Sequence, residues 1–580
     1  MKNRGIHPST RPLVFRAGLQ SGLAVSFLLS GIAGGPVALA DDDHPHFRPD
    51  HLLLSRVVYG NNPSTIVAGV TQLPPNCVGT ACVTATDGGS YPNVWNNALI
   101  DSSFGITSKI VLDQLTRDGD LINSLEVPNS SQRESRPNRD QMVGSFSSKS
   151  EVALNLSTDH RFVTFMGYLA PIGALDVSNS NTPAVVDPTN PMSGQNYRVV
   201  ARVDRDGEFH FTKTNAYSGN NGRAAILNDK HDADILYTAG NAGNGGNPQP
   251  DGIIVGAGAQ ILSAETKPLS VQSPGLPTPV GSFSITQLGL KADKVGKDTN
   301  FRGLTIFDDV LYFTKGSGGN GVNTVYFIDA SGFDGSGKPL ACPNGVGVPR
   351  PLATLPTSPI AYNAALLQTQ GVVPYNMCIL RGFPTALAKN PTAFPFGVWF
   401  ANAKTLYVAD EGDGTATFDA AAGKYTHASQ QTTAGLQKWV FDDGLGTWKL
   451  AYVLQAGLDL GVPYTIGGYP TGNNPATGRP WSPASDGLRN ITGRVNRDGT
   501  ATIWGITSTV SGNGDQGADP NKLLMITDNL AATSLPAGES FDTLRTARFA
   551  EVLRGVSLTP GTGVRREDTA DASHEDDDRR

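Results

Sequence analysis

Four arginines recur at nearly the same position of a degenerate sequence repeat, and their chemistry is the most specific that the sequence offers. They are Arg223, Arg302, Arg489 and Arg554. A guanidinium keeps its charge at physiological pH and presents a fork of N–H donors. Around one opening, each adjacent pair would repel by about 2 kcal/mol at a separation of about 8 Å. The pattern therefore calls for a negative partner.

Two kinds of partner fit this pattern. One is an anionic ligand, such as a carboxylate, phosphate or sulfate, held by paired hydrogen bonds. The other is structural, with each arginine bonding carbonyls or an aspartate of the neighbouring repeat, such as Asp298 or Asp486. The corresponding positions of the two remaining repeats hold Glu151 and Phe396. Glu151 is therefore our candidate for a general base or metal ligand, and a salt bridge to a neighbouring arginine is the structural alternative.

Loops rich in aspartate, asparagine and glycine recur in the same repeats. Asp410 and Asp413 belong to one loop, and Asp515 and Asp519 belong to another. Oxygen-rich loops of this kind suit Ca²⁺, which takes six to eight oxygen ligands. Their spacing matches no known calcium loop, and turn chemistry explains the same residues without an ion. The sequence therefore leaves two interpretations: a Ca²⁺ site with these four aspartates as candidate ligands, or polar turns that bind no ion.

Recognised catalytic motifs are absent from the sequence. It contains no G-x-S-x-G elbow, no H-E-x-x-H and no Walker loop. The sequence alone therefore leaves open whether the chain is an enzyme.

The elements that must position these residues are short strands. Apolar or alternating runs of five to eight residues are separated by glycine, asparagine, aspartate and proline clusters, and helical periodicity is almost absent. The repeat is clearest in two copies, with predicted strands at 301–307, 310–314 and 324–328, and at 396–400, 405–409, 436–441 and 448–454. We interpret each copy as a four-stranded antiparallel blade, and the whole as an all-β propeller.

The two ends of the repeat region complete one blade. Residues 553–558 have the pattern of a first strand with almost nothing after it, whereas 52–59 resemble a second strand that lacks a first. Pairing them would close the ring and remove two open edges. First strands near 151, 223, 302, 396, 489 and 553 predict six blades, or seven if 95–110 contains a further strand. A two-sheet sandwich is the alternative, and we expect a monomer.

Antiparallel order then places the candidate residues on one face. A first strand begins at the end of the blade where the second strand finishes. The arginines and the loops after the second strands should therefore surround one mouth of the central channel.

The first forty residues have the features of a secretory leader. Basic residues up to position 16 precede a mostly apolar segment at 17–33, and Ala38-Leu39-Ala40 supplies the small-x-small cleavage pattern. Glycines and a proline interrupt the apolar run before it reaches the roughly 20 residues of a membrane span. We predict a signal peptide at 1–40, a polar linker at 41–50, the propeller at 51–562 and a disordered acidic tail at 563–580. The expected location is secreted or periplasmic, with no membrane span.

Charge and cysteine usage agree with this location. Without the four basic residues of the leader, the net charge of −7 becomes −11, which disfavours nucleic acid or an anionic membrane as a partner. In an exported chain, four cysteines and no C-x-x-C spacing predict two disulfides. The expected pairs are Cys77 with Cys82, and Cys342 with Cys378.

Two segments carry a resemblance to a known class. Leu-Tyr-Val-Ala-Asp-Glu at 406–411 and Phe-Arg-Gly-Leu at 301–304 resemble blades of secreted six-bladed propellers of the lactonase and NHL-like kind. The chain is also similar to uncharacterised exported bacterial propeller proteins. The resemblance implies a divalent metal at the channel mouth, held by a Glu and Asn or Asp at the starts of first strands. Glu151 matches that Glu, whereas arginines occupy most of the other positions.

Together these features predict a protein that binds a small anionic or polyhydroxylated ligand at the channel mouth. In one version it is a hydrolase, lyase or lactonase assisted by a divalent cation. The alternative is a non-enzymatic extracellular scaffold for a protein or glycan. A cell-surface recognition module that uses the acidic tail is a third hypothesis.

Overall fold

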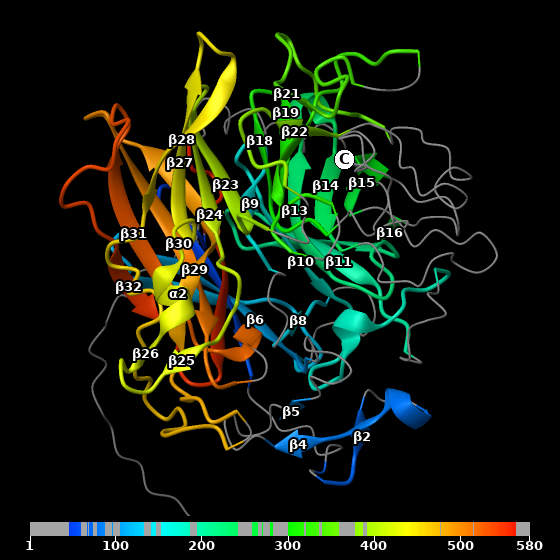
Figure 1. Cartoon of the computed structure of the whole chain (residues 1–580). Helices are drawn as coiled ribbons and strands as arrows, with labels where there is room; N and C mark the ends of the chain where they lie inside the picture. Colours follow the sequence, from blue (N-terminus) through cyan, green and yellow to red (C-terminus); the bar gives the residue numbers. More distant parts are fainter. Residues whose placement is uncertain are drawn as a thin grey trace, which may run out of the picture. The chain divides into compact units, whose positions relative to one another are not determined.

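Six antiparallel sheets arranged in a ring make the chain a six-bladed β-propeller (Figure 1). The first strands of consecutive blades contact one another all the way round, from β9 through β13, β18, β23 and β29 to β33 and back to β9. From the first strand to the fourth, blade 1 consists of β33 (Glu551–Leu558), β1 (Leu52–Val58), β6 (Thr107–Leu115) and β7 (Leu121–Glu126). Blade 2 consists of β9 (Asn155–Leu156), β10 (Val163–Tyr168), β11 (Arg198–Val203) and β12 (Phe209–Thr214). Blade 3 consists of β13 (Gly222–Asn228), β14 (Ile235–Gly240), β15 (Ala259–Ser263) and β17 (Pro279–Gly281).

Blades 4 to 6 follow the same plan. Blade 4 consists of β18 (Leu304–Phe307), β19 (Val310–Lys315), β20 (Thr324–Ile328) and β22 (Cys378–Leu380). Blade 5 consists of β23 (Pro395–Asn402), β24 (Thr405–Asp410), β27 (Gly435–Asp442) and β28 (Thr447–Leu454). Blade 6 consists of β29 (Ala484–Val495), β30 (Thr500–Val510), β31 (Lys522–Asn529) and β32 (Asp542–Thr546). Figure 1 shows the yellow strands of blade 5 beside the orange strands of blade 6.

The computed structural model describes part of the chain, all of it within the compact unit 45–580. The described residues are 46–59, 67, 69–73, 78–87, 95–96, 105–132, 141–146, 152–185, 194–241, 258–264, 269–270, 279–281, 300–317, 321–335, 339–358, 377–386, 391–475, 477–513 and 516–563. The predicted leader, most of the linker, nearly all of the acidic tail, Cys77, Glu151, Asp298 and Asp515 lie outside them. None of the described helices is long and apolar enough to span a membrane.

The predicted ring closure is confirmed. Strand β33 pairs antiparallel with β1, with Leu52 opposite Leu558 at one end and Val58 opposite Glu551 at the other. Strands β6 and β7 complete this blade, so it combines both ends of the repeat region. The sheets form six blades, so the seven-blade alternative is wrong. Of the described residues within 95–110, β5 (Trp95–Asn96) pairs with β4 (Thr86–Asp87) outside the six ring sheets, and the rest lie in or next to β6 of blade 1.

Buried hydroxyl groups join neighbouring blades by a recurring hydrogen bond. On the second strand of blade 1, Ser55 donates to the carbonyl of Val152 at 2.8 Å. On the second strand of blade 2, Thr164 donates to the carbonyl of Ala225 at 2.7 Å. Thr314 of blade 4 does the same to a carbonyl of blade 5. The hydroxyl thus satisfies a buried acceptor at the blade interface that strand pairing alone leaves open.

Glycines next to the repeated arginine position allow the first strands to approach closely. A Cβ added to Gly303 would lie 2.3 Å from the carbonyl oxygen of Phe396, in the next blade. A Cβ on Gly555 would lie 2.5 Å from the carbonyl oxygen of Val152. No real Cβ fits at such distances, so the Arg-Gly pairs at 302–303 and 554–555 are required partly by packing at the centre of the ring.

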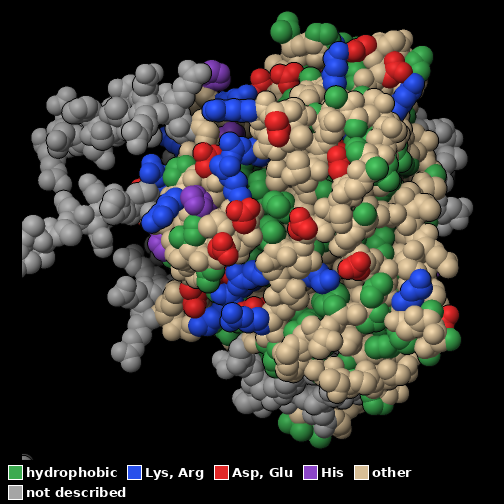
Figure 2. Space-filling model, turned by 90° about the vertical axis from the view of Figure 1, so that its left-hand side faces the viewer, with side chains coloured by type: hydrophobic (Ala, Val, Ile, Leu, Met, Phe, Trp, Pro, Cys, Tyr) green, Lys and Arg blue, Asp and Glu red, His purple; other side chains and the backbone are tan. Residues whose placement is uncertain are grey.

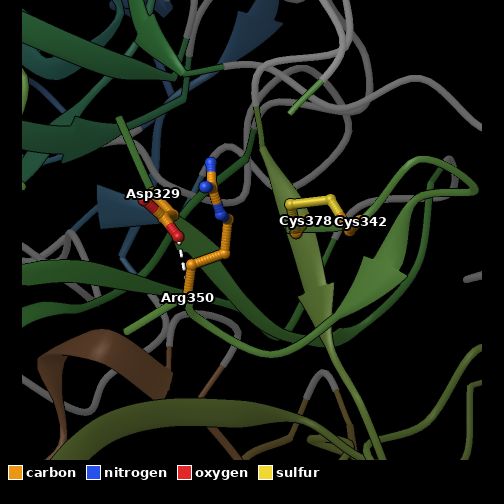
Figure 3. Close-up of a disulfide and its surroundings, with 4 residues drawn as sticks. All are labelled: Asp329, Cys342, Arg350 and Cys378. Atoms are coloured by element: carbon orange, nitrogen blue, oxygen red, sulfur yellow. Dashed lines mark hydrogen bonds between the residues drawn. A yellow bond between two sulfur atoms is a disulfide. The ribbon is translucent and has the colours of Figure 1, made fainter. Parts of the chain in front are cut away.

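A disulfide joins Cys342 and Cys378, as the sequence predicts (Figure 3). It ties β22 to the segment that follows β20, and the two cysteines are 36 residues apart. Beside it, the Arg350 backbone N–H donates to Asp329 Oδ2 at 2.7 Å and fixes the same segment to the end of β20. Cys82 is also disulfide-bonded.

On the face shown in Figure 2, lysine and arginine side chains are interspersed with aspartate and glutamate, and hydrophobic side chains are scattered among them. Such mixing is usual for a surface in contact with water.

Replacing Gly555 with alanine tests the close approach of the first strands. The new Cβ would meet the backbone of blade 2, so Gly555→Ala should lower the free energy of unfolding by about 1–3 kcal/mol. Denaturant titration measures this change. The matched control is Gly467→Ala, whose Cβ would meet nothing within 4 Å, with an expected change within about 0.5 kcal/mol. Equal stability of the two variants would contradict the packing argument.

Candidate functional site

A buried glutamate lies between two of the predicted arginines at one mouth of the ring. Glu411 follows β24 of blade 5, Arg302 precedes β18 of blade 4, and Arg489 lies within β29 of blade 6. Glu411 Oε1 is 3.3 Å from Arg302 Nη2, and Glu411 Oε2 is 3.1 Å from Arg489 Nε. Three blades thus contribute one charged cluster. Its position agrees with the expectation that first-strand starts and second-strand ends share one face.

Burial makes this cluster electrostatically important. The three side chains are each less than 10% exposed. Burial lowers the pKa of Arg302, the Glu411 charge raises it, and the Arg489 charge lowers it. The two guanidiniums therefore sense each other, and Glu411 offsets their repulsion. Removing one partner of a buried ion pair leaves an uncompensated charge, which is strongly destabilising.

A pocket of about 370 Å³ opens beside the cluster. We call it the mouth pocket and define it by its lining residues: Arg302, Gly316, Ser317, Asn323, Pro391, Phe394, Glu411, Gly412, Asp413, Gly414, Asp486, Arg489, Ser508, Thr509 and Gln516. Charged and neutral polar groups dominate the lining, and Pro391 and Phe394 add an apolar side. Blades 4, 5 and 6 all contribute to it.

Asp486, in the lining of the mouth pocket, has a strongly perturbed ionisation. Burial raises its pKa to about 7, and the charges of Asp413 and Glu411 act in the same direction. Its two oxygens accept hydrogen bonds from the Gly414 backbone N–H at 2.8 Å and from Gln431 Nε2 at 2.6 Å. A carboxyl in this state exchanges a proton near neutral pH, which is what general acid or base catalysis requires.

Asp410 stabilises the loop that carries Glu411. It is fully buried, and burial raises its pKa to about 6. Its carboxylate accepts from the backbone N–H groups of Phe394 at 2.8 Å and Gly412 at 3.0 Å, and from Gln437 Nε2 at 3.1 Å. These donors belong to the loop and to neighbouring strands, so Asp410 acts here as a structural residue.

The two other predicted cation ligands that the structure describes, Asp413 and Asp519, are also engaged with their own surroundings. Asp413 lies 2.5 Å from His427 Nε2 and accepts from the Thr415 backbone N–H. Asp519 is buried in a different loop, where it accepts from the Tyr469 hydroxyl at 3.0 Å, and burial raises its pKa to about 7. Within the part of the chain that the structure describes, no group of three or more histidine, cysteine, aspartate or glutamate residues has the geometry to hold a metal ion. The predicted Ca²⁺ site stays a prediction.

The other two arginines differ from the pair in the mouth pocket. Arg554 Nη2 donates to the carbonyls of Ser145 and Gly517, at 3.2 Å each, and to the carbonyl of Phe146. This arrangement matches the structural alternative stated for the repeat position. Arg223 is buried in β13 and does not line the mouth pocket.

Sequence reasoning missed the central residue of this site. It named Asp298 and Asp486 as possible counter-charges but not Glu411, which forms ion pairs with both Arg302 and Arg489. The available signal was the position of Glu411 directly after a second strand, at the face where the arginines were expected.

Comparisons with known proteins assign no family to the chain. No protein-family model matches it, and no curated protein matches it in sequence. Among solved structures, an acylaminoacyl peptidase of Pyrococcus horikoshii is 8% identical, with a TM-score of 0.26 over 77% of this chain and 44% of its own.

Two further solved structures are similarly distant. An apocarotenoid oxygenase of Synechocystis is 9% identical, with a TM-score of 0.21 over 78% of this chain and 59% of its own. The NanB sialidase of Streptococcus pneumoniae is 10% identical, with a TM-score of 0.14 over 90% of this chain and 53% of its own. The chain spans about half the length of these proteins. The assignment as a six-bladed propeller rests on its own sheets.

The raised pKa of Asp486 predicts a specific pH dependence of stability. The native state binds this proton more tightly than the unfolded chain, whose aspartates titrate near 3.8. The stabilisation is therefore complete below about pH 4 and is lost as the pH rises through about 7. We expect the melting temperature to fall less between about pH 5 and about pH 8 in Asp486→Asn than in the wild type.

Asp498→Asn is the control for this measurement, because Asp498 is exposed and hydrogen bonds from Thr500 lower its pKa. It should keep the slope of the wild type. An unchanged slope in Asp486→Asn would mean that Asp486 titrates normally.

Proposed function

We propose that this chain is a secreted or periplasmic propeller that binds a small polyhydroxylated ligand, such as a sugar acid, in the mouth pocket. The observation that carries the proposal is the cluster of Arg302, Glu411 and Arg489, which faces one pocket of about 370 Å³ together with Asp486. A pocket of this size accommodates a ligand of one or two sugar rings.

The balance of charges favours hydroxyl groups over a multiply charged anion. Glu411 offsets one of the two guanidinium charges, and Asp413 adds a second carboxylate to the same lining, so the pocket carries little net positive charge. A phosphate or sulfate ester would prefer arginines that share no carboxylate, whereas a neutral or singly charged polyhydroxylated compound needs no strongly positive pocket. A sugar hydroxyl both donates and accepts, and carboxylates beside guanidiniums offer both functions. Phe394 adds an apolar surface for the face of a sugar ring.

The same pocket also supports acid–base chemistry. Asp486, with a pKa of about 7, is suited to donate or accept a proton near neutral pH. The two guanidiniums are placed to stabilise negative charge that develops on a carbonyl oxygen. A hydrolase, lyase or lactonase acting on the bound polyhydroxylated compound is therefore the enzymatic form of the proposal.

Thermal unfolding with a panel of ligands tests binding. The panel contains neutral sugars, hexuronic acids, sugar phosphates and inorganic sulfate. We expect hexuronic acids to raise the melting temperature most, because they combine ring hydroxyl groups with one carboxylate for a guanidinium. A ligand at 100 times its Kd stabilises the folded state by about 2.7 kcal/mol. Arg489→Lys keeps the charge but loses the guanidinium fork, so the rise should be largely lost.

The matched control for binding is Arg223→Lys, at the same repeat position but outside the mouth pocket. It should retain the ligand-induced rise. If no compound shifts the melting temperature, or if Arg489→Lys responds like the wild type, the binding proposal fails. The non-enzymatic scaffold for a protein or glycan is then preferred.

Turnover is tested separately on sugar lactones and glycosides, with products detected by NMR. The Asp486→Asn variant should turn over a substrate of the wild type about 10²–10⁴-fold more slowly, because it loses the proton-transfer group. It should still show the ligand-induced rise in melting temperature. Full activity in Asp486→Asn would exclude Asp486 as the acid–base group, and no turnover by the wild type would leave a binding protein.

A further inference from the structure

A lysine and an aspartate form a completely buried ion pair between blades 5 and 6, in a different part of the ring from the mouth pocket. Lys438 lies on β27 and Asp528 on β31. Lys438 Nζ is 2.9 Å from Asp528 Oδ2, and neither side chain has any exposed surface. Removing two such charges from water is costly, so the pair needs either a dense set of hydrogen bonds or a chemical use.

Two tyrosines hold the pair in contact. Tyr407 and Tyr452 both donate their hydroxyl hydrogens to the Asp528 carboxylate, the second at 2.6 Å. Lys438 Nζ donates to the Tyr452 hydroxyl at 2.9 Å and to the carbonyl of Asn529 at 2.6 Å. Both tyrosines belong to the apolar cluster between blades 5 and 6, whose other buried members are aliphatic or aromatic. The amine and the carboxyl are thus fixed next to each other in a medium without bulk water.

A second carboxyl group, that of Glu539, lies beside the pair in the loop before β32. Burial, and after it the neighbouring Asp528 carboxyl, raises the pKa of Glu539 to about 7. One oxygen of Glu539 accepts from the Asn529 backbone N–H at 3.1 Å, and the other, Oε2, is buried without a hydrogen-bond partner among the described residues. Lys438 donates to the carbonyl of the same Asn529, so the glutamate and the lysine meet at one residue. A buried carboxyl oxygen that accepts no hydrogen bond favours the protonated form, so Glu539 is placed to carry a proton.

We propose that Lys438 and Asp528 condense spontaneously into an isopeptide bond that links blade 5 covalently to blade 6, with Glu539 as the catalytic proton carrier. Glu539 protonates the Asp528 carboxylate, which makes its carbonyl carbon electrophilic. The ionised Glu539 then takes a proton from the Lys438 ammonium. The neutral amine attacks the carboxyl carbon, the C–N bond forms, a C–O bond breaks and one water leaves. Ammonium plus carboxylate gives amide plus water, so the step balances without any oxidant, reductant or cofactor.

Geometry is what favours this unusual step. Holding the reactants in contact replaces a bimolecular encounter, and exclusion of water removes the competing nucleophile. The chain offers an internal comparison in Lys404–Asp443 and Lys449–Asp442, which are ion pairs at 2.5 Å and 2.6 Å. Their side chains are largely exposed, so both charges stay hydrated. We expect these two pairs to remain unlinked.

Mass spectrometry of the purified, folded, then reduced and denatured chain tests the proposal. The wild type should weigh one water less than its sequence predicts. Proteolysis should release a branched peptide that contains both Lys438 and Asp528, while Lys404 and Lys449 appear in linear peptides. A wild type of full sequence mass, with Lys438 and Asp528 in separate linear peptides, would overturn the proposal and leave a salt bridge.

Two variants assign the roles. Lys438→Arg keeps the cation but removes the amine nucleophile, and Glu539→Gln keeps a hydrogen-bonding side chain but removes the carboxyl that carries the proton. Both should have the full mass of their own sequences while circular dichroism shows a folded β protein. If Glu539→Gln loses one water as completely as the wild type, Glu539 is not the proton carrier. If Lys438→Arg still loses one water, the bond lies elsewhere.

Discussion

The pairing of β33 with β1 is the constraint on which the rest of the structure depends. It joins strands about 500 residues apart in the sequence and supplies the first strand of the blade that closes the ring of six sheets. Each blade is then packed on both sides, and no first strand is left with an open flank. The buried hydroxyl bonds and the close-approach glycines support the same ring, because each joins one blade to the next.

The mouth pocket depends on the packing of neighbouring blades around the ring. Its charged residues come from three consecutive blades, and no single blade could assemble them. Glu411 holds the two arginines together. Asp410 and Asp486 stabilise the loop after Glu411 by accepting hydrogen bonds from the backbone N–H groups of Gly412 and Gly414, respectively. Burial gives both aspartates a raised pKa, so the region is least costly to fold when they are protonated. Such a balance between stability and reactive ionisation is common at functional sites.

The sequence predicted the architecture well and the site only in part. Short alternating strands and the incomplete first and last repeats were sufficient for a six-bladed ring closed by its ends, since both are local patterns. That Arg302 and Arg489 share a face with the loop after a second strand followed from strand order alone. Which of them share a pocket did not follow, because this depends on side-chain direction: Arg554 bonds carbonyls, whereas Arg302 and Arg489 meet Glu411. The buried contact of Lys438 with Asp528 joins residues 90 positions apart and has no sequence signature.

The blade shared between the two ends of the ring also governs the order of assembly. Strand β33 is the last strand of the ring in the sequence. While the chain is being synthesised, one edge of β1 therefore stays unpaired until residues 551–558 have been made. Exposed strand edges are the usual starting point of aggregation, and contacts across so many residues form slowly. A nonsense mutation that removes only the final strand would therefore be expected to leave an incompletely folded chain that aggregates or is degraded. It would not leave a folded propeller that merely lacks one strand.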